Sequence, residues 1–139
     1  MIVVGDEVRA AISAKKAVVA LESTIFSSLG LPTPANSEAL ARCTKAVREA
    51  GAVPALTAVV DGVIWAGVPD ELVQRVLGAS VKLAARDLGV ASAQRLPVGV
   101  TTVGASLAIA DKIGIEVFAT GGIGGVHRGS EITGDISAD

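Results

Sequence analysis

The side chains that could do chemistry in this sequence stand beside short apolar runs. Glu22 directly follows the run at residues 17–21 and precedes two hydroxyl residues, Ser23 and Thr24. A carboxyl group at the end of a buried strand is partly desolvated, which raises its pKa and suits a proton donor. A solvated acid at the end of a strand fits the same position equally well. Glu22 is therefore a candidate general acid with a plain structural alternative.

A second candidate is Lys82, a cation between the apolar residues Val81 and Leu83. A lysine in such a run either extends its ammonium group to water or meets an anion. Further along the chain, Thr101 and Thr102 stand where a helix is expected to begin. They could cap that helix, or lend backbone N–H groups to the same anion.

A glycine-dense stretch at residues 120–125 follows the apolar run at 115–119. Glycines after a buried strand let the backbone turn tightly and point N–H groups at an anion. The stretch matches neither common phosphate motif, because His127 replaces the third glycine of the dinucleotide fingerprint and no Gly-Lys-Ser/Thr occurs. A structural turn is the alternative. Arg128 favours anion binding, although a surface charge, and a structural or solvated role for the only histidine, stay open.

Asp135, Ser137 and Asp139 fall at alternating positions. In an extended segment all three side chains would project to one face. Two carboxylates with a hydroxyl between them can hold a divalent cation and its waters, or bind sugar hydroxyls. A polar surface strand or turn is as compatible with this spacing.

Short apolar runs alternate with helical patterns, and these elements must position the candidate side chains. Such alternation indicates an α/β sheet with crossover helices, and Asp-Gly between two strand-like runs indicates a hairpin. The sequence predicts strands at 17–21, 53–60, 63–66, 115–119 and within 81–85, a hairpin turn at 61–62, and helices at 6–16, from 36 or 37 to 50, from 69 onward and from 101 or 102 to 113.

Residue spacing also predicts how two of these helices begin, end and pack. Asn36 or Ser37 is the expected cap of the first, and Gly51 its left-handed stop. Gly114 is the expected stop of the second. The 115–119 strand is expected to be buried. The residues predicted to face inward are Leu40, Cys43, Val47 and Ala50 on the first helix and Val103, Leu107, Ala110 and Ile113 on the second.

Composition excludes several classes of partner. Half of the 139 residues are hydrophobic and the formal net charge is −2, which leaves no broad positive footprint for duplex nucleic acid. Phe26, Trp65 and Phe118 are the only aromatic residues, so no stacking platform for single strands exists either. Nucleic acid polymers are therefore not expected as partners.

The single cysteine, Cys43, cannot form an intramolecular disulfide, and a reducing, cytoplasmic location fits best. The most apolar region, 96–126, carries Asp111, Lys112 and Glu116 near its middle. A membrane span needs about 20 apolar residues without charge, so no membrane association is expected.

Several segments taken in order resemble the pseudouridine-5'-phosphate glycosidase family, which includes proteins named for indigoidine synthesis. The resemblance runs from about residue 15 to residue 139. Its most specific parts are the glycine stretch with the residues around it and the final Asp-Ile-Ser-Ala-Asp. The segments that carry it are residues 19–25, 51–55, 86–88, 101–103, 117–129 and 135–139.

The resemblance implies a fold, a reaction and a set of site residues. The fold would be three-layer α/β/α with a mixed, mostly parallel sheet, in a homotrimer that binds manganese (Mn2+). The reaction would be reversible cleavage of pseudouridine 5'-phosphate with water to uracil and ribose 5-phosphate. The implied roles are Glu22 as proton donor, Lys82 as phosphate ligand, Val103 as substrate contact, Asp135 as metal carboxylate, Ser137, Ala138 and Asp139 as substrate-binding segment, and His127 and Arg128 near the phosphate.

Cleavage of a C–C glycosidic bond sets a chemical requirement that residues 1–139 meet only in part. Uracil bound through carbon offers no leaving oxygen or nitrogen to protonate, so the paired-carboxylate mechanism of ordinary glycosidases does not suffice. Opening the ribose and forming an imine at C1' requires an amine nucleophile. The resemblance places the family's catalytic lysine after Asp-Ile-Ser-Ala-Asp, in chains about twice this length.

We therefore expect residues 1–139 to be the N-terminal portion of one glycosidase-like domain, apparently truncated and inactive alone. A sugar-phosphate-binding fragment without catalysis, or one half of a split enzyme, is the alternative. An unrelated phosphosugar-binding enzyme that shares only a glycine loop is a third.

Overall fold

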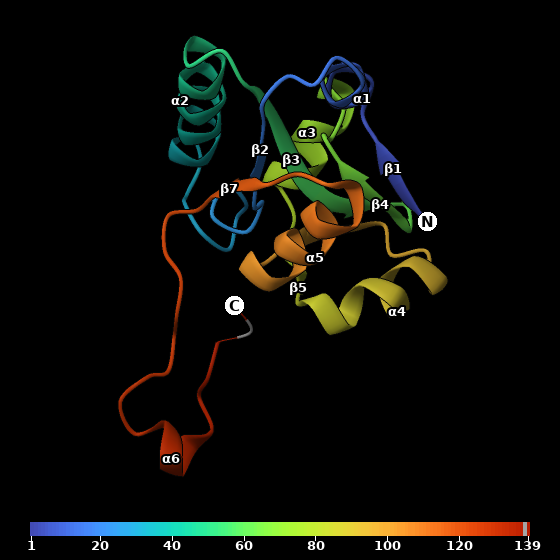
Figure 1. Ribbon diagram of the computed structural model, residues 1–139. Helices are drawn as coiled ribbons and strands as arrows, with labels where there is room; N and C mark the ends of the chain where they lie inside the picture. The colour runs from blue at the N-terminus through green and yellow to red at the C-terminus, as the bar shows by residue number, and fades with distance from the viewer. Residues whose placement is uncertain (138) are drawn as a thin grey trace.

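The computed structural model describes residues 1–137 and 139, and its elements alternate between strand and helix along most of the chain (Figure 1). Their order and bounds are β1 (Ile2–Val4), α1 (Asp6–Ser13), β2 (Val18–Leu21), α2 (Ala35–Glu49), β3 (Val53–Val60), β4 (Val63–Ala66), α3 (Asp70–Leu77), β5 (Lys82–Leu83), the 3-10 turn η1 (Ala85–Asp87), α4 (Leu88–Ala93), β6 (Val98–Thr101), α5 (Val103–Ile113), β7 (Val117–Ala119) and α6 (Ser130–Thr133).

The seven strands form a mixed sheet with the order β1-β4-β3-β2-β7, to which β6 and β5 attach beside β3. Four of the six pairings in the described chain are parallel: β1 with β4, β2 with β3, β2 with β7, and β5 with β6. The pairings of β3 with β4 and with β6 are antiparallel. The prediction of a mixed, mostly parallel sheet is confirmed.

The β3–β4 hairpin turns at Asp61 and Gly62, as the Asp-Gly pair predicts. Both residues have positive φ, 52° and 76°. That backbone matches the twist of the two strands and favours glycine at the second position. Gly62 is also closely packed, because a Cβ there would lie 2.7 Å from the Cα of Arg95.

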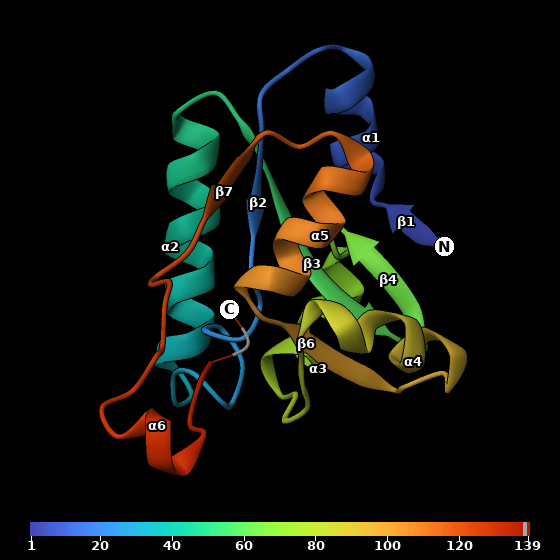
Figure 2. The same cartoon turned by 60° about the horizontal axis from the view of Figure 1, so that its bottom comes forward.

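Helices cover both faces of the sheet, which gives the three layers (Figure 2). Side chains alternate along β3: Leu56, Ala58 and Val60 pack against α2 and α3. Residues Ala55 and Val59 face the other way, toward the layer formed by α1, α4 and α5. A strand covered on both faces is expected to be largely apolar, and β3 is apolar except at Thr57, whose buried hydroxyl is hydrogen-bonded.

Several predicted details of the helices are wrong. Helix α2 begins at Ala35, after Pro34, and the side chain of Asn36 is buried and donates to Leu77 O (3.3 Å). Cys43 is exposed, because the inward face of α2 follows Asn36 and Leu40. Leu107 of α5 is 42% exposed. By contrast, Gly51 and Gly114 have the positive φ expected of helix stops.

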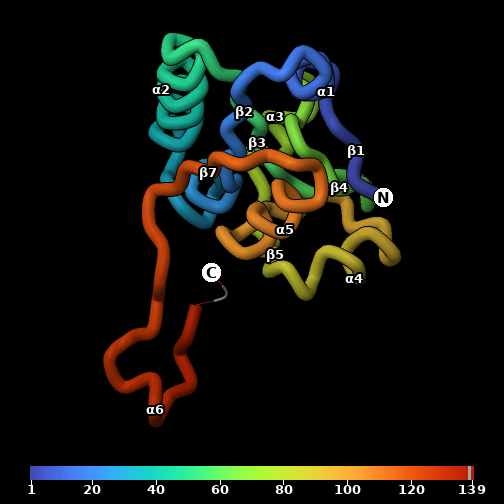
Figure 3. Tube along the Cα trace, in the orientation of Figure 1, coloured from blue at the N-terminus to red at the C-terminus, as the bar shows by residue number. Residues whose placement is uncertain are grey.

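Strand β7 is an edge strand, whereas the sequence predicted a buried one. It pairs only with β2 in the described chain, and Val117 is 54% exposed. Beyond it the chain leaves the body as an arm, residues 120–137, which turns back at α6 (Figure 3). Residues Val126 and Ile136 bridge the two sides of this arm. No helix in the described part of the chain is long and apolar enough to cross a membrane.

Candidate functional site

Four strand ends converge beside the middle of β3. Strand β2 pairs with the first half of β3 and β6 with the second half, in opposite directions along the same edge. Their carboxyl ends therefore meet near Thr57. Strands β7 and β5 run parallel to β2 and β6, and they bring two further carboxyl ends to this point. Ligands of open α/β sheets bind in such crevices, where neighbouring connections diverge.

A cavity of about 290 Å³ opens at this convergence. It brings together five of the residues singled out in the sequence, Glu22, Lys82, Val103, Ser137 and Asp139, although they come from four separate parts of the chain. Ala138, also predicted to bind substrate, lies outside the described residues. The remaining lining residues are Thr24, Ile25, Gly30, Thr102 and Gly122.

Glu22 is the buried acid of this cavity, with a residue exposure of 7%. Burial raises the pKa of its carboxyl group, and the nearby charge of Asp139 raises that pKa further. Hydrogen bonds from the Thr120 hydroxyl and from the backbone N–H of Ile25 act in the opposite direction, because they favour the carboxylate. The net raised pKa makes Glu22 suited to hold a proton and give it up inside the cavity.

Lys82 brings positive charge to the same cavity. The exposed side chain of Lys82 forms no ion pair with a carboxylate anywhere in residues 1–137 or in Asp139. Beside it begins α5, whose Thr102 side chain accepts a hydrogen bond from the Ala105 N–H. The N-terminus of a helix attracts anions through its dipole and its unpaired N–H groups. Lys82 and the start of α5 thus form a cationic wall of the cavity that also holds the buried acid Glu22.

The arm places the other predicted residues outside the cavity. Neither His127 nor Arg128 lines it, and both are exposed. The carboxylate of Asp135 lies 3.2 Å from Nδ1 of His127 and is 68% exposed. Asp135, Ser137 and Asp139 therefore do not share one face of a site as the alternating positions predicted. The roles of His127, Arg128 and Asp135 stay predictions.

Asp135 and the adjacent His127 ring are the potential metal ligands that the structure places together in the arm. Within the described residues no three His, Cys, Asp or Glu side chains lie close enough together to hold a metal ion. We therefore derive no chemical step through a metal.

Sequence reasoning missed Thr120, whose hydroxyl donates to the Glu22 carboxylate. The same hydroxyl lies 2.9 Å from the carbonyl oxygen of Gly122, a residue that lines the cavity. Thr120 therefore connects the acid to the glycine stretch. Its position between a strand and the glycines was a usable signal, since it follows β7 as Glu22 follows β2.

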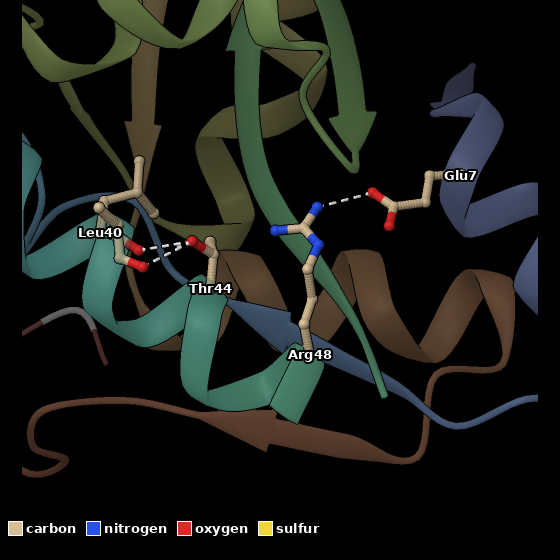
Figure 4. Close-up of polar contacts among 5 residues, drawn as sticks. Glu7, Leu40, Thr44 and Arg48 are labelled. Atoms are coloured by element: carbon tan, nitrogen blue, oxygen red, sulfur yellow. Dashed lines mark hydrogen bonds and ion pairs between the residues drawn. The ribbon is translucent and has the colours of Figure 1, made fainter. Parts of the chain in front are cut away.

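A larger cavity of about 520 Å³ lies between α1, α2 and α3, away from these strand ends. The one cation among its described lining residues, Arg48, already has a partner in the chain (Figure 4). Arg48 donates to Glu7 at 2.9 Å, and the Thr44 hydroxyl lies 2.9 Å from Leu40 O. None of the candidate residues from the sequence lines it. Volume alone favours this cavity, whereas the chemistry favours the smaller one.

Comparison with known proteins decides the family. The family model for indigoidine synthase A like protein matches residues 7–139. The chain belongs to this family. A pseudouridine-5'-phosphate glycosidase of Rhodospirillum centenum is 54% identical over 134 residues, and one of Herpetosiphon aurantiacus is 47% identical over 140 residues. These matches cover 96% and 99% of this chain but 41% and 46% of the relatives, so the chain spans less than half their length.

Two solved structures share the fold. The crystal structure of the prealnumycin C-glycosynthase AlnA, in complex with ribulose 5-phosphate, matches with a TM-score of 0.84 and 42% identity. That match covers 99% of this chain and 44% of AlnA. An indigoidine synthase A-like protein of Thermotoga maritima matches with a TM-score of 0.77 and 35% identity, over 88% of this chain and 40% of its own.

Proposed function

We propose that residues 1–139 supply the proton-donating and phosphate-binding part of a pseudouridine-5'-phosphate glycosidase site. The observation that carries the proposal is the 290 Å³ cavity, which brings together a buried acid, Glu22, and the cation Lys82. The chain belongs to a family with relatives named for this activity. The substrates would be pseudouridine 5'-phosphate or, in the reverse direction, uracil and ribose 5-phosphate.

Each wall of the cavity has a task in this chemistry. Lys82 and the start of α5 would hold the phosphate, because both attract an anion. Glu22, whose pKa is raised by burial, would give a proton to the ribose ring oxygen as the ring opens. The hydroxyl of Ser137 and the carboxylate of Asp139 would bind sugar or uracil groups. The amine nucleophile belongs, by resemblance, to sequence beyond residue 139.

Manganese, a homotrimer and a cytoplasmic location are also part of the proposal, and the family resemblance supports them. When bound, a divalent cation would supply charge that orients uracil. Broadening of the Asp135 NMR resonances on addition of Mn2+ would support the proposed manganese site. Sedimentation of the purified chain, alone and extended to the length of its relatives, tests whether the protein forms a homotrimer.

Uracil release tests the activity. A chimera of residues 1–139 followed by the remainder of the Rhodospirillum centenum relative, with that relative as control, should release uracil from pseudouridine 5'-phosphate. A folded but silent chimera beside an active control would contradict the proposal. Release by residues 1–139 alone would place the nucleophile on a lysine within them, with Lys82 as first suspect.

A second candidate function is sugar-phosphate binding without catalysis. The observation that favours it is the cavity itself, because Lys82 and the start of α5 suit a phosphate whether or not a reaction follows. Binding of ribose 5-phosphate by residues 1–139, with no uracil release even beside a separately expressed second half, is the expected result for this candidate. Release on mixing the two halves would instead indicate a split enzyme.

A further inference from the structure

Beneath the cavity lies a buried cluster of four hydroxyl groups, those of Ser23, Thr57, Thr101 and Ser106. All four residues are 0% exposed. Ser23 follows β2, Thr57 lies within β3, Thr101 ends β6, and Ser106 belongs to α5. The Thr101 hydroxyl lies 2.8 Å from that of Thr57 and 3.1 Å from that of Ser23, and Thr57 donates to Ser106 at 2.9 Å. One polar cluster therefore joins four elements.

Every hydrogen of the cluster has an acceptor. The Thr101 hydroxyl donates to Thr57 O (2.8 Å), Thr57 to Leu21 O (3.0 Å) or to Ser106, and Ser106 to Thr102 O (2.8 Å). Ser23 Oγ accepts from the Thr101 N–H at 2.9 Å, and its own hydrogen points to the Thr101 hydroxyl. Buried hydroxyls with all partners in place hold a specific geometry, because any shift leaves one of them unpaired.

The cluster lies at a junction in the sheet that has no regular backbone hydrogen-bond pairing between strands. Strands β2 and β6 meet end to end, so regular pairing cannot join them. Backbone hydrogen bonds across the junction are long: Ser23 N to Thr101 O is 3.4 Å and Thr24 N to Thr101 O is 3.3 Å. The hydroxyl contacts of the same residues are shorter, and the Thr24 hydroxyl reaches Thr101 O at 2.8 Å. Side chains thus replace the missing ladder.

Both walls of the cavity are attached to this junction. Glu22 directly precedes Ser23, and Thr102, which caps α5 before Val103, directly follows Thr101. The Thr102 N–H donates to Leu83 O at 3.0 Å, which extends the connection to β5 and its Lys82. A displacement at Thr101 would therefore change the distance between the acid and the cationic wall.

We propose that Thr101 and its hydroxyl partners are positioning residues that fix the spacing between Glu22 and the Lys82–Val103 wall. Isosteric apolar side chains would fill the same space at similar stability, but without directional contacts. The inference rests on the proposed function for its significance, because the spacing matters only if both walls bind one ligand.

The test uses the 139-residue chain and compares Thr101→Val with Thr101→Ser, which keeps the hydroxyl. Thr44→Val is the matched control, because its hydroxyl also bonds a backbone carbonyl but lies on α2, outside the cavity. The readouts are the affinity for ribose 5-phosphate and the pH midpoint of the Glu22 carboxyl resonance. Amide resonances across the rest of the chain report whether each variant is folded.

We expect Thr101→Val to weaken binding about tenfold and to move the Glu22 midpoint toward its ordinary value, because the acid loses its fixed, buried position. Thr101→Ser should restore both, and the control should change neither. Should Thr101→Val fail to fold, Ser106→Ala takes its place with the same expected effects.

The proposal would be overturned if a folded Thr101→Val chain kept the unmodified chain's affinity for ribose 5-phosphate and its pH midpoint for the Glu22 carboxyl. Equal effects of Thr44→Val would also overturn it. If the parent chain binds no ribose 5-phosphate, the proposed function fails. In that case the pH midpoint of the Glu22 carboxyl still tests the positioning role of Thr101. Thr101→Val should shift this midpoint and Thr101→Ser should restore it.

Discussion

The two cavities of this molecule differ in almost every property that marks a binding site. The larger one, about 520 Å³, has one cation among its described lining residues, Arg48, which is paired with Glu7, and it also holds the carboxylates Asp70 and Glu71, which have no ion pair in the described chain. The smaller one, about 290 Å³, holds a buried acid with a raised pKa and a lysine without an ion pair in the described chain. Charges that are not neutralised within the protein are available to a ligand. The comparison teaches that an unpaired cation in the same cavity as a buried acid identifies a sugar-phosphate site better than volume does.

The largest effect is expected for Glu22→Gln in the chimera, which tests whether the acid of the smaller cavity is catalytic. The variant keeps the shape of the cavity and removes the proton, so uracil release should fall at least about a hundredfold while ribose 5-phosphate binding persists. Turnover is followed by uracil absorbance or chromatography. Unchanged turnover would remove Glu22 from the acid role.

Lys82→Ala should weaken ribose 5-phosphate binding by about 10- to 150-fold, because a charge-assisted hydrogen bond contributes about 1.5–3 kcal/mol. Arg48→Ala, which removes the cation of the larger cavity, is the matched control and should leave the affinity unchanged. Calorimetric titration of both variants measures the difference. Equal losses of ribose 5-phosphate affinity in Lys82→Ala and Arg48→Ala would contradict the assignment of binding to the smaller cavity.

The raised pKa of Glu22 predicts a dependence of stability on pH. The folded chain holds this proton more tightly than the unfolded chain, so the acid becomes destabilising as pH rises from its ordinary value of 4.5 through the raised folded value. Glu22→Gln should therefore raise Tm at neutral pH, and the gain should vanish well below pH 4.5. Thermal unfolding monitored across that range tests the sign. A gain independent of pH would show that burial of the charge is not its cause.

The smallest effect is expected for Glu7→Gln, which breaks the pair with Arg48 in the larger cavity. Both side chains are at least half exposed, 56% and 50%, so the loss of stability should stay below about 1 kcal/mol. Ribose 5-phosphate affinity should not change. A clear loss of affinity would mean that the larger cavity also takes part in binding.

Much of the fold was predictable because its signals are local. The apolar run of β3 and the Asp61-Gly62 turn predict the hairpin, and Gly51 and Gly114 mark helix ends. The start of α2 and the exposure of Cys43 were not predictable in this way, because packing against α3 rotates the helix so that Asn36 faces inward.

The site was predictable residue by residue, but its assembly was not. Glu22 and Lys82 can be identified as candidates in the sequence. They line one cavity because β2 and β6 run toward each other along β3, and this long-range pairing cannot be derived from local sequence. The same holds for the hydroxyl cluster: the sequence indicates Thr101 only as a possible helix cap or anion contact and Thr57 only as part of a strand, and their shared hydrogen bonds depend on the convergence of the strand ends. His127 and Arg128 show the converse, because they adjoin the glycines in sequence while the arm carries them outside the cavity.

The central claim is that the smaller cavity binds a sugar phosphate. Two-dimensional NMR of the labelled 139-residue chain, titrated with ribose 5-phosphate, tests it most directly. We predict saturable shifts at Glu22, Lys82 and Val103, and none at Thr44 or Arg48. Shifts confined to the larger cavity, or no saturable shift at millimolar ligand, would contradict the account.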